Sequence, residues 1–289
     1  MAGKVNHDFH ILEPDIWPLI GSISALTFTS GMVMSFHPDN FGAAANFVIW
    51  LGLAGVLATF FFWFRNIVIE AQRGDHTPVV QLHMRYGMIL FIASEVMFFV
   101  GWFWSFFDFA LFPDPLVYDH DTDTTTNLFG QAGAVAQFIP EGMEVLDPFA
   151  LPLLNTMILL CSGTTVTWAH HALIHGDREG LKQGLWATIA LGVLFSCIQA
   201  YEYSVAPFGF GGNTYSSAFY MATGFHGFHV LIGTIFLAVC LYRAYLGHFT
   251  PRQHFGFEAA AWYWHFVDVV WLFLFIAVYI WGGWGAEYH

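Results

Sequence analysis

The sequence predicts an all-α polytopic membrane protein with seven transmembrane helices. Of its 289 residues, 57% are hydrophobic and only 10% are charged, whereas an ordinary soluble domain is about a quarter charged. Seven apolar stretches reach the roughly 20 residues that a helix needs to cross the hydrocarbon core. The alternating strands of about ten residues that are typical of outer-membrane barrels are not found. Because backbone polar groups must be bonded within the bilayer, each stretch is expected to be a helix.

Each helix is predicted from an apolar run that is bounded by polar or turn-forming residues. The second run has no charged residue in 24 positions and is the least ambiguous. The third, fourth and sixth runs exceed the length that a bilayer requires, so we expect them to tilt or to extend beyond it. In chain order, the predicted helices are 16–36, 41–64, 86–112, 149–174, 183–203, 215–246 and 257–281.

The basic residues lie in alternate connections of this topology. The N-terminal tail and the connections after the second, fourth and sixth helices, with their adjoining ends, hold all 8 Lys and Arg residues. Basic residues collect on the inner side of membranes, so the N-terminus is predicted inside and the C-terminus outside. A miscount by one helix would break this alternation, which supports the number seven. We interpret residues 1–289 as a single integral membrane domain.

The long connection 113–148 is predicted to be an acidic outer loop. It carries seven acidic residues and no basic one, and so holds much of the net charge of −13. An acidic outer face would attract a basic soluble partner at low salt. Nucleic acid is excluded as a partner, because 8 Lys and Arg residues are too few for a phosphate-binding surface.

Glu95 is the first candidate functional residue. It lies nine residues into the third predicted helix, which is roughly 14 Å along the helix axis and near the middle of the bilayer. A carboxylate at this depth is costly and suggests a functional site, such as a proton relay. A neutral acid that is hydrogen-bonded between helices is an equally weighted alternative.

A second candidate is a polar cluster on the last two helices. His226 and His229 have i, i+3 spacing, as do His265 and Asp268, so each pair shares a helix face. The four residues are expected at overlapping depths and have the side chains of a transition-metal site. Buried histidines more often form hydrogen bonds that join helices. The residues alone leave both interpretations open.

A third candidate is a belt of residues at the inner membrane surface. Cations there can bind phospholipid phosphates, while an aromatic ring lies at the interface. The alternative is that the positive charge only sets the topology. The proposed lipid-binding residues are Trp63, Arg65, Glu70, His76 and Arg85.

Five motifs make the sequence similar to a known family. They are RYGMILFIASEVMFF at 85–99, PLLNT at 152–156, TWAHH at 167–171, TGFHGFH at 223–229 and HFGFEAAAWYWHFVDVVW at 254–271. In this order they resemble subunit III of the cytochrome c oxidases, within the haem-copper oxidases, over most of residues 8–283. The long outer loop and the extended N-terminus look more bacterial than mitochondrial.

The resemblance implies a particular arrangement of the helices and their ligands. Residues 16–64 would form a two-helix bundle and residues 86–281 a five-helix bundle, in a 2 + 5 arrangement around a lipid-filled V-shaped cleft. Haem and copper would belong to partner subunits I and II. This chain would hold bound phospholipids but no metal, which makes the histidine cluster structural. Glu95 matches the family's buried carboxylate, and Glu70, His76 and Arg85 match its lipid-facing inner region. Ile69 stands where many members have an arginine.

The resemblance also implies a function. We expect a non-catalytic, non-redox subunit of a proton-pumping cytochrome c oxidase in an aerobic respiratory chain, located in a bacterial cytoplasmic (inner) membrane. It would bind phospholipids, stabilise catalytic subunit I and support proton uptake, with cytochrome c as the substrate of the complex. The alternatives are the equivalent subunit of a quinol oxidase, a self-contained His/Asp metalloenzyme and a proton channel through Glu95.

Overall fold

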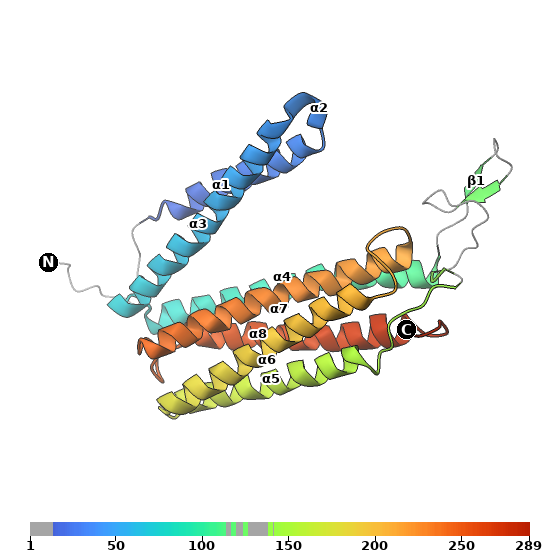
Figure 1. Cartoon of the computed structure of the whole chain (residues 1–289). Helices are drawn as coiled ribbons and strands as arrows, with labels where there is room; N and C mark the ends of the chain where they lie inside the picture. The colour runs from blue at the N-terminus through green and yellow to red at the C-terminus, as the bar shows by residue number, and fades with distance from the viewer. Residues whose placement is uncertain (1–13, 114–116, 120–123, 127–137, 141) are drawn as a thin grey trace. The chain divides into compact units, whose positions relative to one another are not determined.

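The computed structural model describes residues 14–113, 117–119, 124–126, 138–140 and 142–289 (Figure 1). Over these residues the protein is helical apart from one short two-stranded sheet. The elements in chain order are α1 (Trp17–Ser35), α2 (Pro38–Phe41), α3 (Ala43–Arg73), α4 (Pro78–Leu111), β1 (Val117–Asp119), β2 (Thr124–Thr126), α5 (Leu151–Ile174), α6 (Arg178–Val205), α7 (Thr214–Tyr245), α8 (Phe255–Leu274) and the π-helix η1 (Phe275–Trp281).

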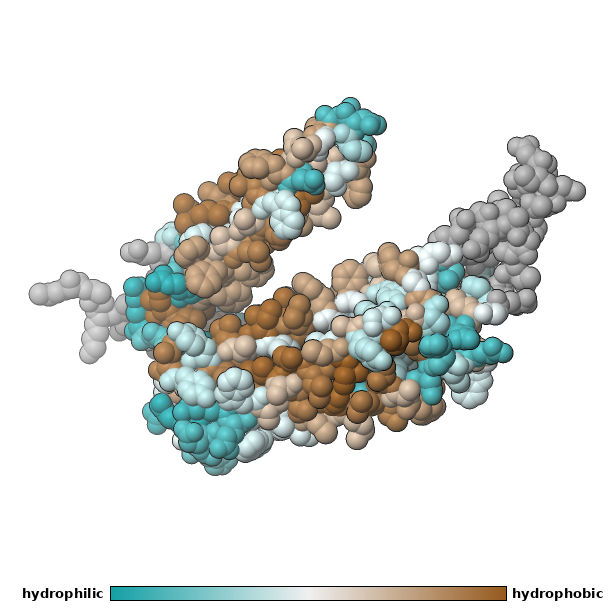
Figure 2. Space-filling view, in the orientation of Figure 1, coloured by the Kyte–Doolittle hydropathy of each residue, from teal (hydrophilic) through white to brown (hydrophobic). Residues whose placement is uncertain are grey.

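Seven of the described helices are long and apolar enough to cross a membrane, η1 being counted with α8. The predicted all-α membrane protein with seven spans is therefore confirmed. Figure 2 shows why such a chain is suited to a bilayer: apolar surface covers the lengths of the helices and hydrophilic residues gather near their ends. The chain forms two compact units, Met1–Met84 and Arg85–His289, and each is described by itself.

Helices α3, α4 and α6 extend well beyond the apolar runs that predicted them, and α4 begins at Pro78, eight residues before the predicted start at 86. Helix α3 continues to Arg73, where Gly74 adopts the left-handed conformation (φ 84°) that ends it. Helix α6 starts at Arg178, and the carboxylate of Asp177 caps it by accepting a hydrogen bond from the backbone N–H of Gly180 at 3.0 Å. Hydropathy detects only the part of a helix that lies in hydrocarbon, whereas these caps set the true ends.

In the first unit, α1 and α3 form a hairpin that is closed by α2 (Figure 1). Small residues let the two backbones approach closely. A Cβ atom on Gly31 would lie 2.6 Å from the backbone nitrogen of Ile49, and one on Gly52 would overlap the backbone of Phe28. Glycine at such contacts is a common way to pack helices where no hydrophobic force drives them together.

The second unit has a well-packed core between α5, α6, α7 and α8. Trp264 of α8 is fully enclosed, and its indole N–H donates to the hydroxyl of Ser162 on α5 at 2.8 Å. Its ring fits against Gly192 of α6 and Gly233 of α7, where a Cβ atom would lie 2.6 Å and 2.9 Å from ring carbons. One tryptophan therefore holds four helices together.

The long connection 113–148 is described only in part. Val117 pairs with Thr126 and Asp119 with Thr124 in the antiparallel sheet of β1 and β2. Further along, Val145 forms a parallel bridge with Tyr288 near the C-terminus. The predicted loop 113–148 contains the acids Asp114, Asp121, Asp123 and Glu141, which lie outside the described residues.

Candidate functional site

The predicted carboxyl group Glu95 forms a pair with a histidine on another helix. Its Oε2 atom lies 2.8 Å from Nε2 of His229, which joins α4 to α7. The Glu95 side chain is 24% exposed, whereas that of His229 is 9% exposed. The structure thus brings together two residues that the sequence analysis placed in separate candidate sites.

The orientation of His229 fixes the number of protons in this pair. Its Nδ1–H donates to the backbone carbonyl of Phe225 at 2.7 Å, since a carbonyl oxygen can only accept. The bond from Nε2 to Glu95 therefore contains one proton, on the carboxyl oxygen or on the imidazole nitrogen. The pair is a neutral acid with a neutral imidazole, or a carboxylate with an imidazolium. Both forms have zero net charge, so the proton can move between them without leaving an unpaired charge in the membrane.

Aromatic rings hold the imidazole of His229 in place. The ring of Phe99 on α4 meets it edge-on with centroids 4.9 Å apart, and Tyr263 of α8 stacks on it at 6.3 Å. These contacts restrict rotation of the imidazole and keep its Nε2 atom directed at Glu95.

His226 makes different contacts from His229 although it lies only one turn away. Its Nε2–H donates to the backbone carbonyl of Val267 on α8 at 3.1 Å. The ring is enclosed between Trp271 and Phe195, with centroids 5.1 Å and 5.8 Å away. His226 thus joins α7 to α8 and does not contact Glu95.

His265 and Asp268 form a third set of contacts, on the side of α8 that faces α5. Nδ1 of His265 lies 3.7 Å from Oδ2 of Asp268, and its Nε2 bonds the hydroxyl of Thr167 at 3.1 Å. Asp268 lies directly against Gly163 of α5, where a Cβ atom would collide with its carboxylate. The structure therefore separates the four residues of the predicted polar cluster into three contacts. Within the described ranges, no three His, Cys, Asp or Glu side chains lie close enough to hold a metal ion.

Arg85, a predicted lipid-binding residue, makes an ion pair within the second unit. Its Nε and Nη2 donate to the Glu258 carboxylate on α8 at 3.0 Å and 2.9 Å. The Arg85 side chain is 35% exposed and that of Glu258 is 14% exposed. Glu258 was missed by the sequence analysis, because it lies next to the expected start of its helix and resembles an ordinary interfacial acid.

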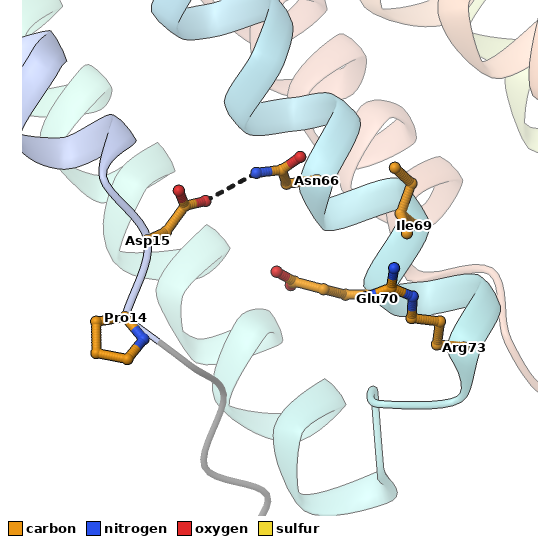
Figure 3. Close-up of a pocket in the computed structure, with 6 residues that line it drawn as sticks. All are labelled: Pro14, Asp15, Asn66, Ile69, Glu70 and Arg73. Carbon is orange, nitrogen blue, oxygen red and sulfur yellow. Dashed lines mark hydrogen bonds between the residues drawn. The ribbon is translucent and has the colours of Figure 1, made fainter.

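The other belt residues lie on the second half of α3 and in the turn after it. Asp15, Glu70 and Arg73 line a pocket of about 220 Å³, together with Pro14, Asn66 and Ile69 (Figure 3). Asn66 donates to the carboxylate of Asp15 at 3.1 Å. His76 lies 3.9 Å from Glu70. Trp63 and Arg65 are exposed on the same helix.

Glu202 is a second buried acid that the sequence analysis missed. It is 0% exposed and lies in the last turn of α6, between two tyrosines. This position next to a predicted helix end makes it look interfacial. The signal that was available is Gln199, a second polar residue one turn earlier on the same face.

Comparisons with known proteins agree with the sequence motifs. The family described as "Cytochrome c oxidase subunit III" matches residues 7–283. "Cytochrome c oxidase subunit 3" of Marchantia polymorpha is 50% identical over 284 residues, which cover 98% of this chain and 100% of that protein. The protein of the same name from Scyliorhinus canicula is 50% identical over 277 residues, covering 96% and 98% of the two chains. That from Cephalophorus natalensis is 49% identical over the same length. This multi-pass membrane protein therefore belongs to the cytochrome c oxidase subunit III family, and so to an oxidoreductase complex with other oxidase subunits.

Proposed function

We propose that this chain is the non-redox subunit of a proton-pumping cytochrome c oxidase, supporting proton supply to the catalytic subunit and retaining phospholipid around it. Subunits I and II would carry the haems and coppers. The observation that carries the proposal is the Glu95–His229 pair. The names of the relatives favour cytochrome c over quinol as the electron donor of the complex.

The pair has the properties of a proton-buffering group inside a membrane. It holds one shared proton at zero net charge, so it avoids the cost of an isolated ion in hydrocarbon. Glu95 is also partly exposed, which gives the proton a path to groups outside this unit. A buffer of this kind would keep protons available when turnover withdraws them.

Exchange of Glu95 tests this role in the complete oxidase complex. Glu95→Ala is expected to assemble normally and to keep its haem content, but to lose activity sooner during repeated turnover. Glu95→Gln keeps a hydrogen bond to His229 without an exchangeable acid proton, so it should fail in the same way. Glu179→Ala is the matched control, because that carboxylate is 74% exposed on α6.

Two outcomes would oppose the proton role. Loss of haem from Glu95→Ala would show that the residue is needed for assembly. A turnover lifetime in Glu95→Gln equal to that of the wild type would show that the hydrogen bond alone is required. Haem spectra measure the first outcome. The number of turnovers completed before activity falls by half measures the second.

Phospholipid retention is the second part of the proposal, and the pocket on the first unit supports it. Arg73 lies one turn after Ile69, so it can supply the cation that many family members place at the position of Ile69. A headgroup phosphate would bind Arg73 in the pocket that Glu70 also lines. Trp63, Arg65 and His76 would contact lipid elsewhere on the same unit. Arg73→Gln should therefore lower the phospholipid retained per purified complex, measured by mass spectrometry of extracted lipid. Arg252→Gln, on a different inner loop, is the control, and equal lipid loss in both variants would refute the assignment.

The membrane orientation belongs to the same proposal. The N-terminus would face the inside and the C-terminus the outside of a bacterial cytoplasmic membrane, with residues 16–64 and 86–281 as two separate helix bundles. A cysteine placed at Glu287 should react with a membrane-impermeant thiol reagent applied from outside. A cysteine placed at Glu179 should react only after the membrane is opened. The reverse pattern would invert the topology.

A further inference from the structure

Glu202 lies in a second polar network that the proposed function does not use. The residue is fully enclosed in the second unit, near the end of α6. An enclosed carboxyl group in a membrane helix is energetically unfavourable unless its charge is neutralised or paired, because burial of an unpaired charge costs a large free energy.

Hydrogen bonds through Glu202 connect three elements. Its Oε1 atom accepts from the hydroxyl of Tyr279 on η1 at 2.7 Å and from the amide of Gln199 on α6 at 3.0 Å. The carbonyl oxygen of Gln199 in turn accepts from the side-chain amide of Asn155 on α5 at 3.3 Å. Tyr279 lies in the π-helical segment, a conformation that frequently marks functional sites.

The network ends at each side on an oxygen atom without a donor. Oε2 of Glu202 and Oδ1 of Asn155 are both enclosed and have no hydrogen-bond partner among the described residues. Two acceptors cannot satisfy each other. One added proton on Oε2 changes this, because it turns an acceptor into an O–H donor for which the Asn155 oxygen is a free acceptor.

Among the described residues, Glu202 has two hydrogen-bond donors on Oε1 but no cationic partner for a negative charge. The titratable groups that act on it or feel its charge are the phenols of Tyr279, Tyr203 and Tyr220, from η1, α6 and α7. On the side of α5, Gln199 connects Glu202 to Asn155, whose side chain is uncharged. None of the ion pairs within the described residues includes Glu202.

We propose that Glu202 is a proton-binding site embedded in the second unit, where it holds a proton on Oε2 and donates it to Oδ1 of Asn155, directly or through one enclosed water. It is therefore a neutral acid that ties α5 and α6 to the π-helical end of the last span. This site is distinct from the Glu95–His229 pair and does not depend on the role proposed for that pair.

Infrared spectroscopy of the purified oxidase complex tests the proposal directly. A protonated carboxyl group has a C=O stretch that is separate from the amide bands and from carboxylate bands. The spectrum of the wild type minus that of Glu202→Gln should contain this band. Loss of a carboxylate band in its place would show that Glu202 is ionised and would overturn the proposal. Glu95→Gln is the matched membrane control, since it should leave the Glu202 band unchanged.

Glu202→Gln is also expected to fold, because its amide reproduces both functions of the neutral acid. The amide oxygen accepts from Tyr279 and Gln199, and the amide N–H donates to Asn155. The complex should therefore keep wild-type thermal stability, whereas Glu202→Ala should lower it. If Glu202→Gln is as unstable as Glu202→Ala, the neutral-acid assignment is wrong.

A variant that keeps Glu202 intact tests the acceptor. Asn155→Leu removes the oxygen that receives the proton, so the C=O band of Glu202 should shift to higher frequency, as expected for an acid that loses its acceptor. An unshifted band in Asn155→Leu would overturn the assignment of Asn155. Thr164→Leu, an exposed position on the same helix, is the control and should leave the band in place.

Discussion

The ion pair between Arg85 and Glu258 gives the sharpest test of the energetics of the second unit. We expect Arg85→Met to weaken the attachment of α4 to α8, because Glu258 then keeps a charge without its bidentate partner. Removal of one partner from a buried pair costs about 3 to 5 kcal/mol. Arg85 is 35% exposed and Glu258 14% exposed, so water screens part of this cost. We expect about 2 kcal/mol, or a roughly thirtyfold change in the unfolding equilibrium.

A double-mutant cycle measures this coupling. The full chain, Arg85→Met, Glu258→Gln and the double variant are unfolded reversibly with SDS in mixed lipid–detergent micelles, followed by circular dichroism. The double variant should be more stable than the sum of the two single effects predicts, because no unpaired charge remains. Each single variant should lower the free energy of unfolding.

The result also decides between two roles for Arg85. If Arg85 acts through a phospholipid headgroup, Arg85→Met should lower the phospholipid retained by the complex while Glu258→Gln does not. If it acts through the ion pair, both variants should retain equal phospholipid and the cycle should show coupling. Additive effects of the two substitutions would refute the ion-pair reasoning.

Two further predictions concern helix packing. Gly52→Val should destabilise the α1–α3 hairpin by about 2 kcal/mol or more, since its side chain would displace the backbone of Phe28. The control in the same unfolding assay is Gly87→Val, because no atom lies within 4 Å of a Cβ at that position. Equal effects of the two substitutions would contradict the close-packing argument. Trp271→Phe should lower the free energy of unfolding by about 1 kcal/mol, because the indole N–H no longer donates to Thr156 at 2.9 Å. In a Thr156→Val background, the same substitution should lower the free energy of unfolding much less. An equal effect in both backgrounds would show that the indole hydrogen bond is unimportant.

The sequence predicted the spans well because the bilayer imposes a simple rule. A helix must be apolar over the thickness of the hydrocarbon, and the composition of this chain leaves seven runs that qualify. The ends were predicted less well. Helix α3 continues nine residues beyond the predicted end at position 64, and it stops at a glycine with positive φ. Such ends depend on local capping in water, which hydropathy does not record.

The site was predicted in part, and the reason lies in the angular positions of the side chains. Glu95 was identified from its depth alone. Its partner His229 was grouped with His226, because residues three apart lie near each other on a helix. They are nevertheless offset by about 60° around the axis, which is enough to direct His229 to α4 and His226 to α8. Which neighbour a helix face meets is decided by tertiary packing.

The contrast between Glu95 and Glu202 leads to a final prediction about reactivity. A hydrophobic carbodiimide reacts with a protonated carboxyl group that it can reach from the lipid. Glu95 can carry the shared proton and is 24% exposed, whereas Glu202 is fully enclosed. Peptide mass spectrometry of the treated complex should therefore find the adduct on Glu95 and none on Glu202.

Substitution separates access from protonation in this experiment. Glu95→Gln should abolish the adduct at position 95 and leave Glu202 unlabelled, because Glu202 cannot be reached even though we assign it a proton. Labelling of Glu202 in the folded complex would show that the reagent reaches the network, and hence that its enclosure is not maintained. On our assignments Glu202 holds a proton and Glu95 shares one with His229, and only the partly exposed Glu95 can exchange its proton during turnover. Access to the surface therefore determines which of the two carboxyl groups can take part in proton supply.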